Sequence, residues 1–425
     1  MNAGFYIIMA AQFCSSLADN ALLVAAIALL MQADSPAWLT PYLKFFFVVS
    51  YVVLAPYVGA FADRLPKGRV MFIANTIKIA GCAIMLFEVN PLLAYALVGL
   101  GAAAYSPAKY GILTEYLPPT KLVAANGWIE GLTVGSIILG TVLGGVLIHE
   151  KVAHQLLQFN APLFDTGIDT PPEAAIAVIV FVYALAAFFN LYIPRTGAPI
   201  KHLPAHPMDT LRDFMFCVSS LWKDRLGQIS LAVTTLFWGA GATLQFIVIE
   251  WSRVTLGYNL SQASILQGVC AVGIALGAVA ASMRVRLDRA VSVIPLGIAM
   301  GLVVILMNVV ASVWLAVPLI VTIGLLAGYF VVPMNALLQH RGHNLMGAGR
   351  SIAVQNFNEN ISILIMIATY SILLALGVSI YWVIALFGLF VATTMLVVKV
   401  WYERNRRVHR VEIEALLEVA RSEKH

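Results

Sequence analysis

Long apolar runs, separated by short polar segments, make up most of this chain. Each run is long enough for a helix rising 1.5 Å per residue to cross a hydrocarbon layer about 30 Å thick. The runs are continuous in polarity rather than alternating, which favours helices over the strands of a membrane barrel. The sequence therefore predicts an all-α protein with twelve membrane-spanning helices. Their approximate bounds are 4–31, 42–62, 70–88, 91–112, 122–148, 174–193, 229–250, 261–281, 292–311, 313–338, 350–376 and 379–401.

Composition supports an integral membrane protein. Hydrophobic residues make up 61% of the 425 residues and charged residues only 11%, whereas an average soluble domain has about 25% charged residues. The formal net charge of +5 needs no nucleic-acid partner, because loops that face anionic lipid are rich in Lys and Arg. The four cysteines are scattered, so neither a disulfide framework nor a metal site is expected. We also expect His149, His154, His340 and His343 to be solvated at loop edges.

The distribution of basic residues predicts the orientation in the membrane. Lys and Arg cluster in alternate connections and in the tail, and the opposite connections contain few of them. Because cytoplasmic loops carry the excess of basic residues, both termini are expected to be cytoplasmic. The first span has no signal-peptide cleavage pattern, so we expect it to be retained. Basic residues on the predicted cytoplasmic side include Arg64, Arg69, Arg195, Arg212, Arg284, Arg286, Arg289, Arg404 and Arg407.

A polar segment divides the predicted spans into two groups of six. Residues 194–228 contain prolines and mixed charges, so we predict a cytoplasmic linker with an amphipathic helix near Met208–Trp222. The expected parts are an N-terminal half (1–193), this linker, a C-terminal half (229–401) and a cytoplasmic tail (402–425). The tail is expected to form an amphipathic helix.

Polar residues recur at similar places in the two halves. Asn126 and Glu130 are four residues apart in the fifth span, and Gln355 and Glu359 have the same spacing in the eleventh. Two six-helix halves around a central cavity, with the substrate held near the middle of the membrane, are the arrangement of major facilitator transporters. If Glu130 and Glu359 face one cavity, their mutual repulsion favours protonation of one of them or binding of a cation. A structural clamp between helices is the alternative.

The connection between the second and third spans resembles a signature of the same superfamily. The segment Gly59–Arg69 contains Asp63, Arg64 and Arg69, but two extra residues separate Arg64 from Gly68. The resemblance implies a conformational latch in which these charges pair across helix ends.

Other ionisable and amide side chains lie inside apolar runs, where they are costly and therefore candidates for function. Asp19, followed by Asn20, lies about 22 Å along the first span, and must pair, bind a cation or become protonated. Lys78 either extends towards the membrane surface or forms a buried pair with an acid on another helix. Lys109, beside Pro107, is either a surface-seeking lysine or part of a gate. Gln245 is either a site residue or a structural hydrogen-bonding group.

Several longer motifs resemble those of the bacterial lysophospholipid transporter family. The most specific are Gly101-Ala-Ala-Ala-Tyr-Ser-Pro-Ala-Lys-Tyr-Gly-Ile-Leu113 and Ala353-Val-Gln-Asn-Phe-Asn-Glu359. The resemblance runs from about residue 5 to residue 400. It also includes Ser15–Leu23, Gly68–Asn75, Phe237–Gly241 and Phe330–Gln339.

This resemblance implies transport of lysophosphatidylethanolamine and lysophosphatidylglycerol from the outer to the inner leaflet of the bacterial inner membrane. A cytoplasmic acyltransferase with acyl-carrier-protein synthetase activity then reacylates them, and the transporter is expected to be a monomer without cofactors. Asp19 and Glu359 match family acids implicated in function. A family arginine falls at Gln245, so a salt bridge from that position is not expected. The substrate and coupling candidates are Asp19, Asn20, Lys78, Lys109, Asn126, Glu130, Gln245, Gln355, Asn356 and Glu359.

Two other functions remain open from the sequence. One is a proton-coupled drug or small-metabolite antiporter of the same superfamily, in which Asp19 or Glu359 takes up the proton. The other is a membrane scaffold without transport activity, in which the buried acids are replaceable. The sequence contains no nucleophile elbow, phosphate-binding loop or zinc motif in a suitable context, so an enzyme is not expected.

Overall fold

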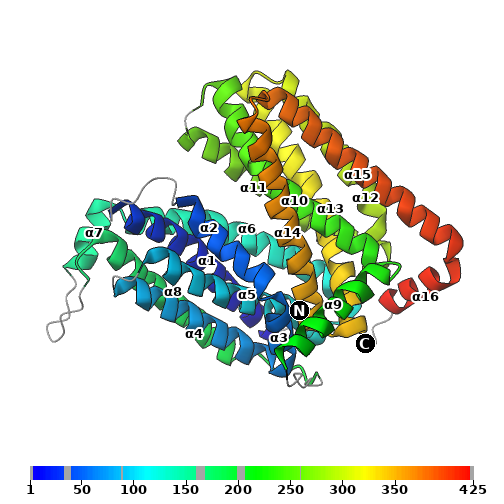
Figure 1. Cartoon of the computed structure of the whole chain (residues 1–425), viewed down its shortest axis with the longest axis horizontal. Helices are drawn as coiled ribbons and strands as arrows, with labels where there is room; N and C mark the ends of the chain where they lie inside the picture. Colours follow the sequence, from blue (N-terminus) through cyan, green and yellow to red (C-terminus); the bar gives the residue numbers. More distant parts are fainter. Residues whose placement is uncertain are drawn as a thin grey trace. The chain divides into compact units, whose positions relative to one another are not determined.

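The computed structural model describes residues 3–32, 40–87, 90–158, 168–198, 206–258 and 260–421, and these residues form helices joined by short connections (Figure 1). The first group of helices is α1 (Ala3–Gln32), α2 (Thr40–Val53), α3 (Ala55–Arg64), α4 (Lys67–Leu86), α5 (Pro91–Tyr116), η2 (Pro119–Lys121), α6 (Leu122–Leu147), α7 (Glu150–Leu157), α8 (Pro171–Leu191) and α9 (Pro207–Lys223). The second group is α10 (Gly227–Leu256), α11 (Leu260–Arg284), η3 (Leu287–Val293), α12 (Ile294–Ile305), η4 (Leu306–Val309), α13 (Val313–Met346), α14 (Ala348–Ala375), α15 (Ile380–Val408) and α16 (Arg410–Arg421).

A helical segment occupies each of the twelve predicted spans. Within the described ranges, eleven helical segments are long and apolar enough to cross a membrane, or twelve if one bent pair counts as a single span. The bent pair is Phe45–Val53 and Ala55–Arg64, whose axes differ by 66°. Pro56 lies in the first turn of α3, and its missing N–H ends the hydrogen-bond ladder of α2. The bend is a local consequence of this proline.

The chain divides into two compact units. The first unit contains Met1–Glu115, Gly135–Phe214 and Ala348–Ala353, and the second contains Tyr116–Val134, Met215–Gly347 and Val354–His425. The start of α6 thus belongs to the second unit and the start of α14 to the first. The division into two sequential halves stays a prediction.

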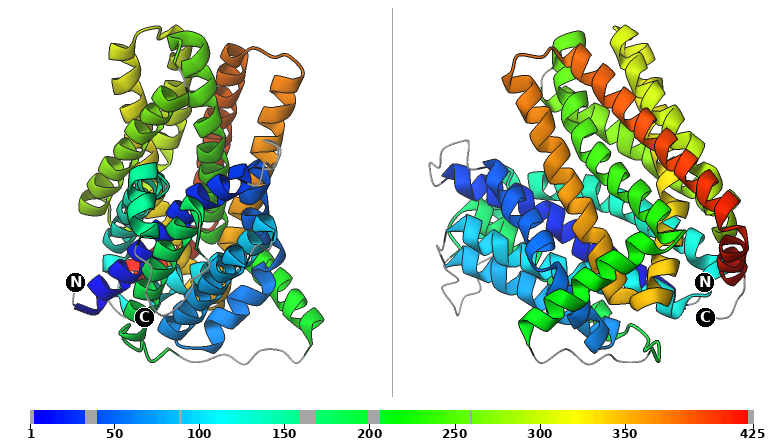
Figure 2. Two further views of the ribbon diagram at one scale, coloured as in Figure 1. Left: turned by 90° about the vertical axis from the view of Figure 1, so that its left-hand side faces the viewer. Right: turned by 45° about the vertical axis from the view of Figure 1, so that its right-hand side comes forward.

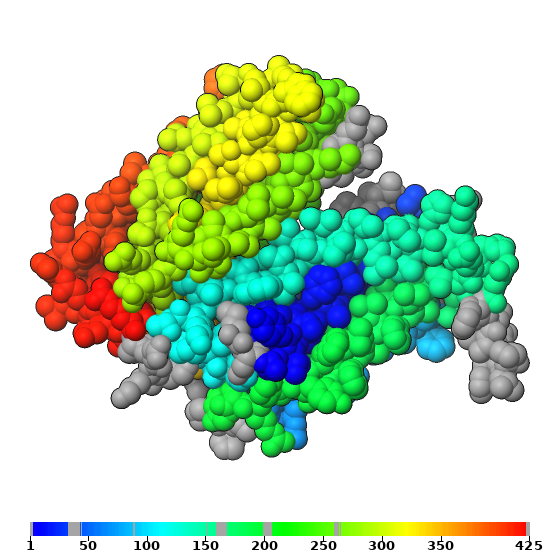
Figure 3. All heavy atoms as spheres, turned by 180° about the vertical axis from the view of Figure 1, so that it is seen from behind, coloured from blue at the N-terminus to red at the C-terminus, as the bar shows by residue number. Residues whose placement is uncertain are grey.

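In the first unit, α1 and α4 pack on α8. Figure 3 shows the blue surface of α1 beside the green surface of α8. The apolar core here includes Leu22, Cys82, Val98 and Tyr183, each fully buried. This packing brings polar side chains of α1, α4 and α8 together inside an apolar environment.

In the second unit, glycines allow two helices to approach closely. A Cβ on Gly328 of α13 would meet the carbonyl oxygen of Ile274 on α11, and a Cβ on Gly277 of α11 would meet the carbonyl oxygen of Leu325. Small residues at such spacing permit close backbone contact in membrane helices. Helices α12 and α15 also lie side by side (Figure 1).

Helices are present in both segments predicted to be amphipathic. Helix α9 covers the predicted Met208–Trp222 helix; residues 199–205 of the predicted linker lie outside the described residues. The tail continues α15 and then forms α16, at the red end of the chain in Figure 2. Residues 422–425 also lie outside the described part.

Candidate functional site

A buried ion pair joins α1 and α4 in the first unit. Lys78 Nζ lies 2.8 Å from Asp19 Oδ1 and 2.9 Å from Oδ2. The hydroxyl of Tyr183 on α8 donates to Asp19 Oδ1 at 2.7 Å. Lys78 also donates to Ser15 Oγ at 3.0 Å, and Ser15 Oγ donates to Asn75 Oδ1 at 2.8 Å. Three helices therefore contribute to one polar centre.

Aromatic rings shield the ammonium group of this centre. Lys78 Nζ lies 4.9 Å from the ring centroid of Tyr105 and 5.4 Å from that of Tyr183, distances at which the ring faces stabilise a cation. The Lys78 side chain is 1% exposed, whereas that of Asp19 is 22% exposed. Lys78 therefore does not extend to the membrane surface; of the two alternatives, the structure has the buried pair. The carboxylate is its accessible member.

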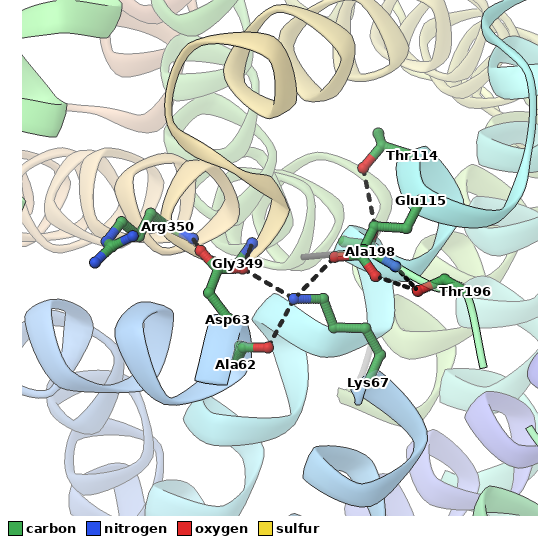
Figure 4. A network of polar contacts seen from close by, with 10 residues as sticks. Ala62, Asp63, Lys67, Thr114, Glu115, Thr196, Ala198, Gly349 and Arg350 are labelled. Atoms are coloured by element: carbon green, nitrogen blue, oxygen red, sulfur yellow. Dashed lines mark hydrogen bonds and ion pairs between the residues drawn. The ribbon is translucent and has the colours of Figure 1, made fainter. Parts of the chain in front are cut away.

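A second polar network of the first unit is centred on Asp63 and Lys67 (Figure 4). Lys67 Nζ lies 2.9 Å from Asp63 Oδ1 and 3.1 Å from Glu115 Oε1. Asp63 also accepts the backbone N–H of Gly349 at 2.7 Å and that of Arg350 at 3.1 Å. Because Gly349 and Arg350 belong to the first turn of α14, the carboxylate faces the positive end of that helix.

Of the three residues predicted to form the latch in the Gly59–Arg69 connection, Asp63 is paired in this structure. Arg64 and Arg69 are exposed, and neither forms an ion pair with another described residue. The cation that pairs with Asp63 is Lys67, which begins α4. Its side chain reaches back over the last turn of α3, where it also donates to the carbonyl of Ala62 at 2.7 Å. With the two extra residues in the connection, a lysine stands at the first position of α4.

In the second unit, two carboxylates are linked by carboxamides. Gln355 Nε2 donates to Glu359 Oε1 at 2.7 Å and to Asn335 Oδ1 at 3.1 Å. Asn335 Nδ2 donates to Glu130 Oε1 at 3.4 Å. Glu130 is 4% exposed and Glu359 is 6% exposed. This carboxylate–amide chain brings Glu130, Gln355 and Glu359 together through Asn335 of α13.

The same unit contains a reciprocal amide pair one turn away from Glu130. Asn126 Nδ2 donates to Gln339 Oε1 at 3.0 Å, and Gln339 Nε2 donates to Asn126 Oδ1 at 2.9 Å. Both residues are buried. Each side-chain amide therefore donates one hydrogen bond to the other and accepts one from it. This is the geometry of a clamp between α6 and α13.

The remaining candidates make other contacts. Gln245 is exposed on α10 and bonds to Gln267 of α11 at 3.1 Å. Asn20 donates to the carbonyl of Ser16 in its own helix at 2.8 Å. Lys109 Nζ lies 4.7 Å from the ring centroid of the adjacent Tyr110. Asn356 is 9% exposed. Their roles stay predictions.

Other buried polar residues are not among those predicted from the sequence. Arg341 forms a bidentate pair with Asp224, with distances of 2.6 Å and 3.1 Å, and both side chains are under a tenth exposed. His340, expected to be solvated at a loop edge, is 4% exposed and lies inside α13, which continues to Met346. The helical pattern of the sequence continues without interruption beyond residue 338, and this could have predicted that His340 lies within the helix. Within the described ranges, no group of three or more His, Cys, Asp or Glu side chains is placed to hold a metal ion.

Comparison with known proteins agrees with this architecture. Residues 8–367 match the family model of the Major Facilitator Superfamily. A bacterial homologue of the iron transporter ferroportin, in an outward-facing state, has a TM-score of 0.70 at 14% identity, covering 95% of this chain and 99% of that one. The transporter FucP, in an outward conformation, has a TM-score of 0.70 at 13% identity, covering 94% and 98%. These two structures show the fold alone. The chain is a member of the Major Facilitator Superfamily, a class of membrane transporters.

Sequence relatives define the family within this class. A protein of Yersinia enterocolitica serotype O:8 named lysophospholipid transporter LplT is 42% identical over 379 residues, covering 89% of each chain. A protein of Yersinia pestis strain Pestoides F with the same name is 43% identical over 371 residues, covering 87% of this chain and 86% of the relative. The chain belongs to the lysophospholipid transporter LplT family.

Proposed function

We propose that this chain carries lysophospholipids from the outer to the inner leaflet of a bacterial inner membrane. The observation that carries the proposal is the 42–43% identity, over nearly nine tenths of the chain, to relatives named lysophospholipid transporters. Lysophosphatidylethanolamine and lysophosphatidylglycerol are the proposed substrates. The long apolar helices support a location within the membrane.

The polar centre of the first unit supports a charged lipid as the substrate. A lysophospholipid combines one acyl chain with a phosphate and a polar headgroup, so its site needs apolar walls and a few charges. Asp19 and Lys78 provide opposite charges inside apolar helices, and Asp19 is the accessible member. We propose that Asp19 receives the ethanolamine ammonium, or a glycerol hydroxyl, of the headgroup. Lys78 and Tyr183 hold the carboxylate in place for that contact.

The other polar groups are assigned to the transport cycle in the same proposal. Alternating access between residues 1–193 and 229–401 would move the lipid, with the Asp63 network as the latch of one state. Glu130 and Glu359 are the proposed coupling acids, supported by their burial. The remaining proposed contributors are Asn20, Lys109, Gln245, Gln355 and Asn356; Asn126 contributes structurally, through its bonds to Gln339 between α6 and α13.

The setting in the cell is part of the same proposal. We propose that both termini are cytoplasmic, because the basic residues cluster on the connections of one side. The transported lipid would pass to a cytoplasmic acyltransferase with acyl-carrier-protein synthetase activity, which restores the second acyl chain. We propose that the transporter acts as a monomer.

Reconstituted vesicles test this proposal. Fluorescent lysophosphatidylethanolamine is added to the outer leaflet, and the fraction that albumin no longer extracts is followed over time. Vesicles with the protein should protect the lipid faster than protein-free vesicles, and equal rates would refute the proposal. A protein that exchanges protons for small drugs, but does not protect the lipid, would instead support the antiporter alternative for which buried Glu359 is the candidate acid.

A further inference from the structure

The tail helix α16 has one apolar stripe on a largely charged surface. Ile413 is 1% exposed and Ala420 is 2% exposed, and Leu416 and Leu417 are partly buried. These four residues have the spacing i, i+3, i+4 and i+7, which puts them on one helix face. A helix of 12 residues is only marginally stable alone in water. Packing against the rest of the second unit therefore stabilises α16.

Ion pairs secure both ends of α16. Near its start, Glu412 Oε2 lies 3.6 Å from Arg225 Nε, in the connection between α9 and α10. At its end, Arg421 Nε lies 3.0 Å from Asp288 Oδ2, in η3. Asp288 is 7% exposed at its side chain and also pairs with Arg286 at 3.3 Å. The apolar stripe lies between these two attachments.

The docked helix bridges connections that are far apart in the sequence. It contacts η2, which joins α5 to α6, and η3, which joins α11 to α12. Figure 3 shows the red atoms of α16 beside the cyan atoms around η2. All of these segments belong to the second unit. The match to the superfamily model ends at residue 367, so α16 lies beyond it.

We propose that α16, with its attachments to η2, η3 and Arg225, is a tail clasp that resists separation of the α5–α6 and α11–α12 connections. These connections leave helices of different predicted halves, so any movement that parts them must first release α16. The tail then acts as a brake on that movement, whatever the transported substrate is. Because its attachments are partly exposed ion pairs, high salt should weaken the brake.

Spin-label distances test the clasp directly. Nitroxides are attached at Lys121→Cys and Arg289→Cys, two exposed positions in η2 and η3, after replacement of the four native cysteines. With the full tail, the distance distribution in lipid nanodiscs should be narrow. Deletion of residues 409–425, or Arg225→Glu, should add a longer-distance population. An unchanged distribution in both variants would overturn the proposal.

A charge exchange separates the clasp from general damage to the fold. Arg225→Glu combined with Glu412→Arg restores opposite charges, so the longer-distance population should shrink to the level of the parent. Arg407→Ala is the matched control: it removes one exposed cationic side chain of the tail that has no ion pair with a described residue, and it should leave the distribution unchanged. Failure of the exchange to restore the narrow distribution would also overturn the proposal.

Discussion

Lys78 and Asp19 are paired across α4 and α1, with Nζ 2.8 Å from Oδ1, but only the carboxylate is accessible. The ammonium group is enclosed by Tyr105 and Tyr183. A charge in such a place costs several kcal/mol unless it is paired. The carboxylate of Asp19 therefore compensates the buried charge of Lys78. It also remains as a fixed negative group on the accessible side of the pair.

This asymmetry predicts unequal effects of removing each partner. Asp19→Asn leaves a buried ammonium without its counter-charge and should lower the free energy of unfolding by about 3–5 kcal/mol. Lys78→Met leaves a carboxylate that water can reach in part, so the loss should be smaller. Denaturant unfolding in detergent micelles measures both. The double variant Asp19→Asn/Lys78→Met should recover part of the loss, and additive losses would contradict the pairing.

The contact of Asp63 with α14 predicts local loosening when the carboxylate is removed. Asp63→Ala removes the acceptor of the Gly349 and Arg350 amides, a loss comparable to that of a helix N-cap, about 1–2 kcal/mol. Hydrogen exchange at the start of α14 should then be about 5- to 30-fold faster. Arg64→Ala, at an exposed position of the same connection, is the control and should leave that exchange unchanged. If hydrogen exchange at the start of α14 were equally fast in the Asp63→Ala variant and the parent protein, the contact of Asp63 with α14 would contribute nothing to the stability of that helix end.

The close approach of α11 and α13 predicts a steric penalty at Gly328. A Cβ there would overlap the Ile274 carbonyl oxygen, and such overpacking typically costs about 1–3 kcal/mol. Gly328→Ala should therefore lower the thermal unfolding midpoint in detergent. Gly268→Ala on α11 is a suitable control, because a Cβ at that position meets no atom within 4 Å. An unchanged unfolding midpoint in the Gly328→Ala variant would show that α11 and α13 can move apart without a loss of stability.

The buried amides and carboxylates of the second unit should differ in what they control. Asn126→Ala breaks the reciprocal bonds with Gln339, and interhelical hydrogen bonds in membranes contribute about 0.6 kcal/mol on average. We expect a small loss of stability and near-normal transport. Glu359→Gln keeps the shape of the side chain and should slow transport strongly at little cost in stability. Transport rates in vesicles and unfolding in detergent, measured on both variants, separate the two roles; the opposite pattern would refute the assignment.

Hydrophobicity predicted the spans well because burial in lipid requires long apolar runs, and repeated spacing pointed to Glu130 and Glu359 as a related pair. The partner of Asp19 could not be chosen from the sequence, because pairing depends on which faces of α1 and α4 meet. The contact of Tyr183 with Asp19 was not predicted, because one tyrosine hardly changes the polarity of an apolar run. The bend before α3 and the contacts of Lys67 both depend on local geometry around a short connection. The periodic pattern of apolar and polar residues does not predict such geometry.

Transport of a lysophospholipid through the centre formed by Asp19 and Lys78 is the central claim made for this protein. Protection of fluorescent lysophosphatidylethanolamine from albumin, measured in vesicles containing equal amounts of folded protein, tests it. The parent protein and Gly268→Ala should protect the lipid rapidly, and Asp19→Asn should be slower by about tenfold or more, the equivalent of about 1.4 kcal/mol in the barrier. Equal rates for the parent protein, Asp19→Asn and protein-free vesicles would contradict the account.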